Sequence, residues 1–213
     1  MNIVLLLITL IILIYSAILH EIAHGLVAER LGDPTAKLMG RLTLNPKNHI
    51  DPYMTILLPL ITFLSSGGTF MFGGAKPVPI DPFNLRDGRK DIALVSLAGP
   101  GTNVLLAIIS AIIFRILAYI PLGTLTPFLS WFFFTAVQLN LLLAIFNLIP
   151  IPPLDGSKIF ALILPENEAN AYLSMGMFGM LIIFSLLIFN FGGFSLGNFM
   201  FSLVTFSEKL LGL

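Results

Sequence analysis

The sequence contains no cysteine, and only 10% of its 213 residues are charged. The absence of cysteine excludes disulfides, iron–sulfur clusters and thiolate metal ligands, so any metal must be held by His, Asp, Glu or Asn. Soluble domains carry about 25% charged residues, whereas this chain is 57% hydrophobic with a mean hydropathy of +0.98. The formal net charge is zero, which gives no reason to expect nucleic acid as a partner. The composition therefore predicts an integral membrane protein in a lipid bilayer.

The N-terminus lacks the basic region and the small-residue cleavage site of a signal peptide. We therefore expect the first apolar helix, over about residues 2–27, to be retained. No Lys or Arg precedes this helix, and four basic residues follow it: Arg30, Lys37, Arg41 and Lys47. The positive-inside rule then predicts a multi-pass protein of the cell membrane with its N-terminus outside and the far end of the helix near the cytoplasm.

The remaining uncharged stretches predict an all-α polytopic membrane protein with five to six transmembrane helices. Two spans are expected over about residues 92–119 and 127–148. A C-terminal helical hairpin is expected over residues 169–213, with its turn near residues 190–193. We expect one domain over residues 1–213, with a core at 1–165.

Three stretches are expected to form less regular elements. Residues 52–75 are uncharged but have basic loops on both sides, which predicts a re-entrant or half-inserted segment, with a sixth full span as the alternative. Residues 37–44 are a candidate cytoplasmic strand, and residues 73–80 a second candidate strand or extended loop. Residues 37–44 are also our hypothesis for an edge that holds an unwound substrate segment.

Two of the three histidines lie four residues apart at the end of the first apolar helix, in the segment HEIAH at residues 20–24. Residues i and i+4 share one helix face, so His20 and His24 can direct two ring nitrogens at one metal ion, with Glu21 beside them. This is the zinc-binding pattern H-E-x-x-H. His20 lies roughly 27 Å along the helix, near the far side of a hydrocarbon core of about 30 Å.

A catalytic zinc needs three protein ligands, and Asp155 is the candidate for the third. It is the only acidic residue between Arg115 and Lys158, and it follows a helix end that three prolines interrupt. The predicted topology places this helix end at the same depth as His20 and His24. Glu21 is then expected to act as general base on a zinc-activated water.

Three further polar residues lie near these motifs. Asn147 is predicted to stabilise the negative charge that develops on the scissile carbonyl, and the alternative is that it satisfies backbone carbonyls freed by Pro150. Asn103 either supports close helix packing near the site or contacts substrate. His49, two residues before Asp51, is interpreted as part of an interfacial loop rather than as a second metal site.

Three segments together, HEIAHG at 20–25, AGP at 98–100 with Asn103, and FNLIPIPPLDG at 146–156, resemble the site-2 protease family of intramembrane zinc metalloproteases. The resemblance covers roughly residues 19–158. It implies that His20, His24 and Asp155 bind one zinc ion, that Glu21 is the catalytic base and that Asn147 assists near the substrate. The family's L-D-G-G reads LDGS here, which should leave the ligand in place. The chain is expected to be a minimal member without a PDZ or other regulatory domain.

The sequence therefore predicts a zinc endopeptidase that hydrolyses a peptide bond in or near a transmembrane segment of a single-span membrane protein. Two alternatives remain open. The first is a proteolytically inactive scaffold or binding relative, which would be expected to have lost Glu21 or a ligand. The second is a divalent-metal transporter, which would normally need polar positions along several spans rather than at one depth.

Overall fold

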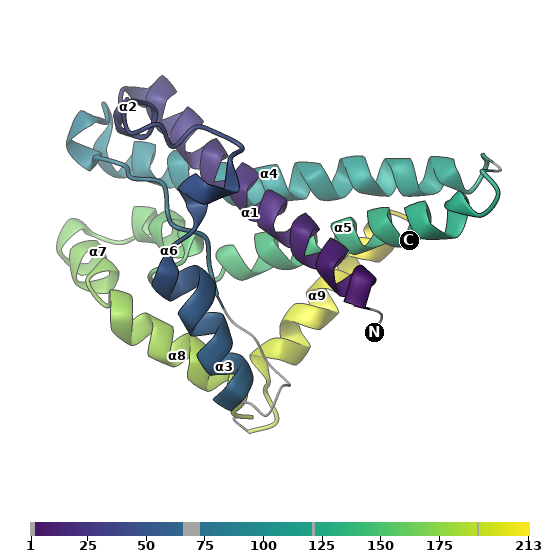
Figure 1. Cartoon of the computed structure of the whole chain (residues 1–213). Helices are drawn as coiled ribbons and strands as arrows, with labels where there is room; N and C mark the ends of the chain where they lie inside the picture. The colour runs from purple at the N-terminus through teal and green to yellow at the C-terminus, as the bar shows by residue number, and fades with distance from the viewer. Residues whose placement is uncertain (1–2, 66–72, 121, 191) are drawn as a thin grey trace.

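The computed structural model describes residues 3–65, 73–120, 122–190 and 192–213 (Figure 1). The regular elements within these ranges are all helical, as the composition predicts, and no β-strand is found among them. The protein is thus an all-α membrane protein.

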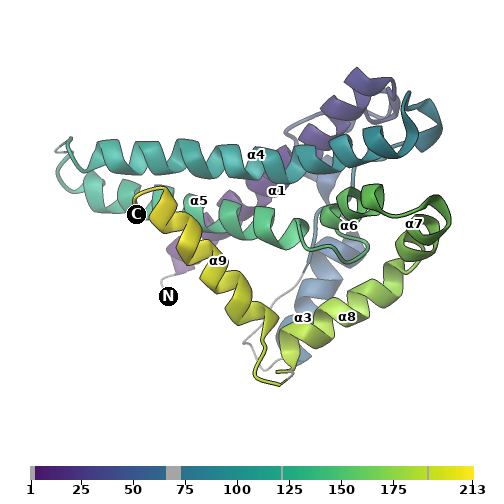
Figure 2. The ribbon, with the colours of Figure 1, turned by 180° about the vertical axis from the view of Figure 1, so that it is seen from behind.

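Three long helices form the centre of the molecule: α1 (Ile3–Leu31), α4 (Gly88–Leu117) and α5 (Leu125–Asn147). Each is long and apolar enough to cross a membrane, which confirms the three spans expected there. Helices α4 and α5 run side by side and α1 crosses them, an arrangement seen from both directions (Figures 1 and 2). Small side chains allow this close packing, since Ala107 and Ala111 of α4 are fully buried against Val137 and Leu141 of α5.

The loop after α1 holds two short helical elements joined by a turn and a bend, and no strand among its described residues. The side chain of Asp33 accepts the backbone N–H of Thr35 at 3.0 Å, which starts the short helix α2 (Thr35–Leu38). Gly40 then turns the chain at φ +64°, and η1 (Pro46–His49) follows. The prediction of a strand over residues 37–44 is therefore wrong, because the side-chain bond at Asp33 and the turn at Gly40 replace an extended edge with a short helix, a turn and a bend.

Asp33 also joins this loop to the segment before α4. Its carboxylate is fully buried and accepts hydrogen bonds from the backbone N–H of Asp81 at 2.7 Å and from Asn84 at 3.0 Å. Burial alone would raise the pKa of Asp33, but these bonds and those from Thr35 outweigh it and lower the pKa. The carboxylate thus remains ionised and holds the two loops together.

The segment after η1 forms η2 (Pro52–Leu57) and α3 (Leu58–Ser65), of six and eight residues. At about 1.5 Å per residue, the 14 residues of these helices span less than a hydrocarbon core of about 30 Å. The half-inserted form of residues 52–75 stays a prediction. Residues 66–72 lie outside the described residues. Residues 73–80 follow as an extended loop without regular structure, one of the two forms expected for them.

The C-terminal part begins with α6 (Asp155–Phe160), η4 (Ala161–Ile163) and α7 (Glu166–Leu173). Helices α8 (Gly176–Ile188) and α9 (Leu196–Leu210) then form the predicted hairpin, whose turn includes Gly192 and Gly193 at φ +59° and +88°. Helix α9 returns to pack on α5 (Figure 2).

The hairpin helices are shorter than the sequence suggests. Helices α8 and α9 have 13 and 15 residues, fewer than the ~20 that a full crossing needs. They are short because turns interrupt this long uncharged stretch. By length and composition, the described part of the chain holds three candidate spans. The number rises to four if α7 and α8, which meet at a bend of 65°, form one broken span.

Candidate metal centre

The first half of the site lies within one helix. His20 and His24 are one turn apart on α1, and both side chains are buried. Their Nε2 atoms lie 3.0 Å apart, and the rings meet edge to face at an interplanar angle of 87°. The helix backbone alone therefore brings two ring nitrogens to one point.

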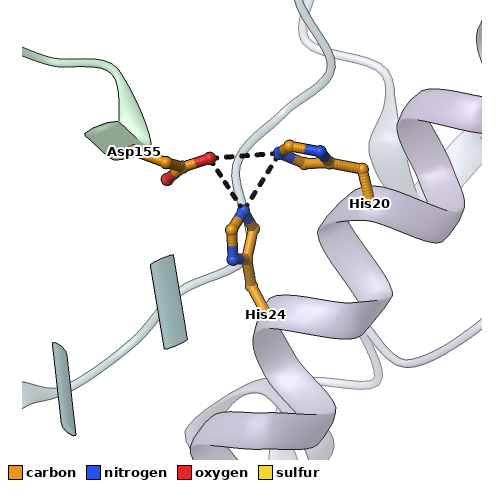
Figure 3. A group of neighbouring side chains, drawn as sticks. All are labelled: His20, His24 and Asp155. Atoms are coloured by element: carbon orange, nitrogen blue, oxygen red, sulfur yellow. Dashed lines mark hydrogen bonds and ion pairs between the residues drawn. The ribbon is translucent and has the colours of Figure 1, made fainter. Parts of the chain in front are cut away.

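The third side chain comes from a residue 135 positions after His20 in the sequence. Asp155 is the first residue of α6, and its Oδ2 lies 3.2 Å from the Nε2 atoms of both His20 and His24 (Figure 3). The turn that presents it is tight, because a Cβ on Gly156 would collide with the carbonyl oxygens of Leu148 and Ile149. The structure thus brings together the three residues that the sequence predicts as ligands.

The outer nitrogens of the two rings fix which tautomer is present. The Nδ1 of His24 lies 2.6 Å from the carbonyl oxygen of Val95, and a carbonyl can only accept, so this Nδ1 carries the proton. The Nδ1 of His20 lies 2.6 Å from Oδ1 of Asn103 and donates to it in the same way. In the neutral rings, neither Nε2 atom then carries a hydrogen, and each presents a lone pair.

Three acceptor atoms therefore converge in a buried space without a donor between them. Such an arrangement repels itself unless a cation lies among the three atoms. Two imidazoles and a carboxylate are the ligands of a catalytic zinc, which leaves a fourth position open. Bonds of about 2.0–2.1 Å at tetrahedral angles separate neighbouring ligand atoms by about 3.3–3.4 Å. The observed separations of 3.0 and 3.2 Å are close to this value, so the residues fit a zinc ion.

Helix α4 approaches this group at a glycine. A Cβ on Gly99 would lie 2.5 Å from the Nε2 atoms of both His20 and His24, closer than real Cβ contacts come. No other residue fits there without displacing the rings. Gly99 thus leaves room for the two imidazoles where α4 crosses α1.

Glu21 lies beside the histidines and is held by the extended loop. It follows His20 by about 100° around the helix, and its Oε2 accepts the backbone N–H of Val78 at 2.8 Å. Since Pro77 and Pro79 have no N–H, Val78 is the one residue of this trio that can donate. The side chain of Arg41 anchors the loop by donating to the carbonyl oxygen of Lys76 at 2.8 Å.

Asp155 has a second partner outside the group of three. Its Oδ1 accepts a hydrogen bond from the ammonium of Lys158 at 3.3 Å, while its Oδ2 faces the two rings. Oδ1 thus bonds to Lys158 and Oδ2 faces the two imidazoles, and the bond to Lys158 limits rotation of the carboxylate.

The other predicted residues lie at different places. Asn147 is the last residue of α5, and its side-chain amide donates to the carbonyl oxygen of Leu143 in the same helix, so its contact with substrate stays a prediction. Asn103 is fully buried and bonds to His20. His49 is buried in η1 and donates through Nε2 to the carbonyl oxygen of Thr43, away from the group of three.

Comparison with known proteins adds an independent observation. The model of peptidase family M50 matches residues 8–124 and 119–188. The chain is 37% identical over 187 residues to "Putative zinc metalloprotease YwhC" of Bacillus subtilis, an alignment that covers 86% of this chain and 81% of the relative.

Two further relatives have the same kind of name. The chain is 35% identical to "Putative zinc metalloprotease Rip2" of Mycobacterium tuberculosis, over 66% of this chain and 51% of Rip2. It is 33% identical to "Putative zinc metalloprotease MJ0611" of Methanocaldococcus jannaschii, over 67% of this chain and 63% of that protein. The chain thus spans about half of Rip2. No solved structure matches it.

Proposed function

Because this chain belongs to peptidase family M50, the site-2 protease family, we propose that it is a zinc endopeptidase acting on a membrane protein in or near a transmembrane segment. The observation that carries the proposal is the convergence of two bare imidazole nitrogens and one carboxylate oxygen within 3.2 Å. A base, Glu21, directly follows His20 in the sequence and is held by the backbone N–H of Val78. The scaffold alternative predicts the loss of one of these four residues, and all four are present.

When bound, zinc supplies a Lewis acid that polarises the scissile carbonyl and lowers the pKa of water. Glu21 takes a proton from the attacking water as the water oxygen bonds to the carbonyl carbon. When the carbon–nitrogen bond breaks, Glu21 delivers this proton to the leaving nitrogen. The hydrogen bond from Val78 occupies one carboxylate oxygen and leaves the other for the proton. Asn147 is proposed to donate to the developing oxyanion.

The position of the site along α1 suggests the class of substrate. His20 is 17 residues from the start of α1 at Ile3, or roughly 26 Å at 1.5 Å per residue, which is within the thickness of a hydrocarbon core. The substrate is then a single-span membrane protein whose helix unwinds locally, because helical amides are already hydrogen-bonded. The basic residues after α1 favour a cytoplasmic depth for the site and an outer N-terminus, in the cell membrane.

The proposal is tested with purified protein in lipid and a synthetic single-span helix that carries a fluorophore and a quencher on either side of a Gly-Pro break. We expect wild type to hold one zinc and cleave the helix, and a chelator to stop cleavage. The variant Glu21→Gln should keep zinc and lose at least ~10²-fold in rate. Glu29→Gln is the matched control, since Glu29 lies on α1 but bonds to Lys37 outside the site.

Two outcomes would overturn the proposal. Zinc binding with no cleavage that depends on Glu21 would favour a scaffold, and wild-type protein without zinc would remove the metal centre itself.

A further inference from the structure

A chain of buried amides joins the candidate metal centre to the middle of the helix bundle. Asn103 of α4 and Asn140 of α5 are 0% and 2% exposed, and Ser16 of α1 is 5% exposed. The Nδ2 of Asn103 donates to Oδ1 of Asn140 at 2.9 Å, and the Nδ2 of Asn140 donates to Oγ of Ser16 at 3.0 Å. One residue from each long helix thus contributes to a polar path that ends at His20.

The directions of the hydrogen bonds in this path follow chiefly from one backbone group. A second carbonyl oxygen, that of Ser16, lies 3.5 Å from the Nδ2 of Asn103 and favours the same orientation, but at a longer distance than the 2.9 Å to Oδ1 of Asn140. The Nδ2 of Asn140 lies 2.8 Å from the carbonyl oxygen of Ala136, which can only accept. The amide of Asn140 is therefore oriented with its Oδ1 toward Asn103. Asn103 must then place its Nδ2 on that oxygen and turn its own Oδ1 toward His20. His20 in turn must carry its proton on Nδ1, 2.6 Å from that Oδ1.

The consequence reaches the metal side of the ring. If Asn103 were reversed, its Nδ2 would face His20 and demand an acceptor at Nδ1, which would place the ring proton on Nε2. A protonated Nε2 cannot bind a metal. His24 needs no oriented side-chain amide to fix its tautomer, since its Nδ1 donates directly to the backbone carbonyl oxygen of Val95. The orientation of a side-chain amide is reversible, whereas the direction of a backbone carbonyl is fixed.

We propose that Asn140, acting through Asn103, is a positioning residue that holds His20 in the tautomer whose Nε2 is available to the metal. The proposal rests on the proposed function, because it takes the group of three residues as a metal centre. It differs from simple interhelical bonding, in which the amides only hold α4 and α5 together. The two accounts make different predictions for replacements that keep an acceptor beside His20.

The decisive variants are Asn103→Leu, Asn103→Asp and Asn140→Leu, with Zn²⁺ affinity measured by competition with a fluorescent chelator. Asn103→Leu removes the acceptor and should weaken binding by about 10–100-fold. Asn103→Asp keeps an acceptor on His20 and should stay within a few-fold of wild type, although it loses the donor to Asn140. Asn140→Leu removes the nearer acceptor and leaves only the carbonyl oxygen of Ser16, at 3.5 Å, to oppose reversal of Asn103, so it should cost about 10-fold.

The double variant provides the sharpest readout. A carboxylate at position 103 has no donor end to turn toward His20, so Asn140 has nothing left to orient. Adding Asn140→Leu to Asn103→Asp should therefore change Zn²⁺ affinity less than twofold, whereas it costs about 10-fold in wild type. Ser110→Ala is the control, because Ser110 is buried on the same helix, α4, but outside this path. The Zn²⁺ affinity of this variant should match that of wild type.

Three results would overturn the inference. These are an Asn103→Asp variant as weak as Asn103→Leu, an equal cost of Asn140→Leu in both backgrounds, and unchanged affinity in all variants. If Asn103→Leu does not fold, the comparison of Asn140→Leu in the two backgrounds still decides. A wild-type protein that binds no Zn²⁺ would contradict the proposed function, whereas binding that none of these variants alters contradicts the positioning role alone.

Discussion

His20 and His24 lie one turn apart on a single helix, whereas Asp155 is 135 residues further along the chain than His20. The two histidines are brought together by the helix itself and need only their Nδ1 partners to set the ring orientation. The position of Asp155 depends on a tight turn, on Gly156 and on what packs behind that turn. The comparison shows that the ligands of one centre can differ greatly in how much of the fold they depend on.

Helix α8 is what packs behind the turn. A Cβ on Gly179 of α8 would collide with the carbonyl oxygen of Pro152, so the helix and the turn are in close contact. The hydroxyl of Tyr172 in α7 donates to the carbonyl oxygen of Pro150 at 2.7 Å. The C-terminal helices therefore support the carboxylate, and changes far from the group of three should affect Asp155 without affecting the histidines.

The largest effect is expected from removal of the ligands themselves. His20→Ala or His24→Ala leaves one helical ligand, and Zn²⁺ binding should fall by more than the ~100-fold that loss of an outer partner costs. Asp155→Ala leaves the preorganised pair and should retain weak but measurable binding by chelator competition. Equal losses in all three variants would contradict the distinction between the helical pair and the loop ligand.

A smaller but clear effect is expected at Gly99. In Gly99→Ala the new methyl group meets the Nε2 atoms of both His20 and His24 at 2.5 Å, so Zn²⁺ affinity and peptide cleavage should fall together by at least ~10-fold. Gly101→Ala is the matched control on the same helix, because nothing lies within 4 Å of its Cβ. If the two variants behave alike, the close approach of α4 to the imidazoles is not required.

The smallest effect is expected from α8. Gly179→Ala should displace the turn before Asp155 and lower the cleavage rate by about 10-fold, since small errors in position are costly in catalysis. Zn²⁺ affinity should fall less, because the histidines are undisturbed. Gly176→Ala in the same helix, with open space around its Cβ, should match wild type. Equal kinetics for both variants would remove the support role of α8.

The helical half of the site could be predicted from the sequence, and the reason is periodicity. A spacing of four residues in a long apolar helix fixes the relative position of His20 and His24 with no knowledge of the fold. Asp155 could be predicted only because it is the single acid in a long uncharged stretch. Its distance to the histidines depends on contacts between α4 and α6, which no local pattern encodes.

The residues that sequence reasoning missed all act through long-range contacts. Val78 binds Glu21 across 57 residues, and Asn140 reaches Ser16 across 124 residues. The segment Pro77–Val78–Pro79 offered one signal, since two prolines leave a single N–H to be satisfied. Asn140 offered another, because an amide in the middle of an apolar span needs partners. The prediction of a strand over residues 37–44 failed for the opposite reason, since the local turns at Asp33 and Gly40 outweighed a weak alternating pattern.

The account's central claim is that one metal ion is bound by two imidazoles from α1 and one carboxylate from α6. X-ray absorption at the zinc edge of the purified wild-type protein in lipid tests this directly. The account predicts four nitrogen or oxygen neighbours at about 2.0–2.1 Å, with the outer-shell scattering of two imidazoles. A third imidazole, which only His49 could supply, or a shell of oxygen ligands without imidazole would contradict it.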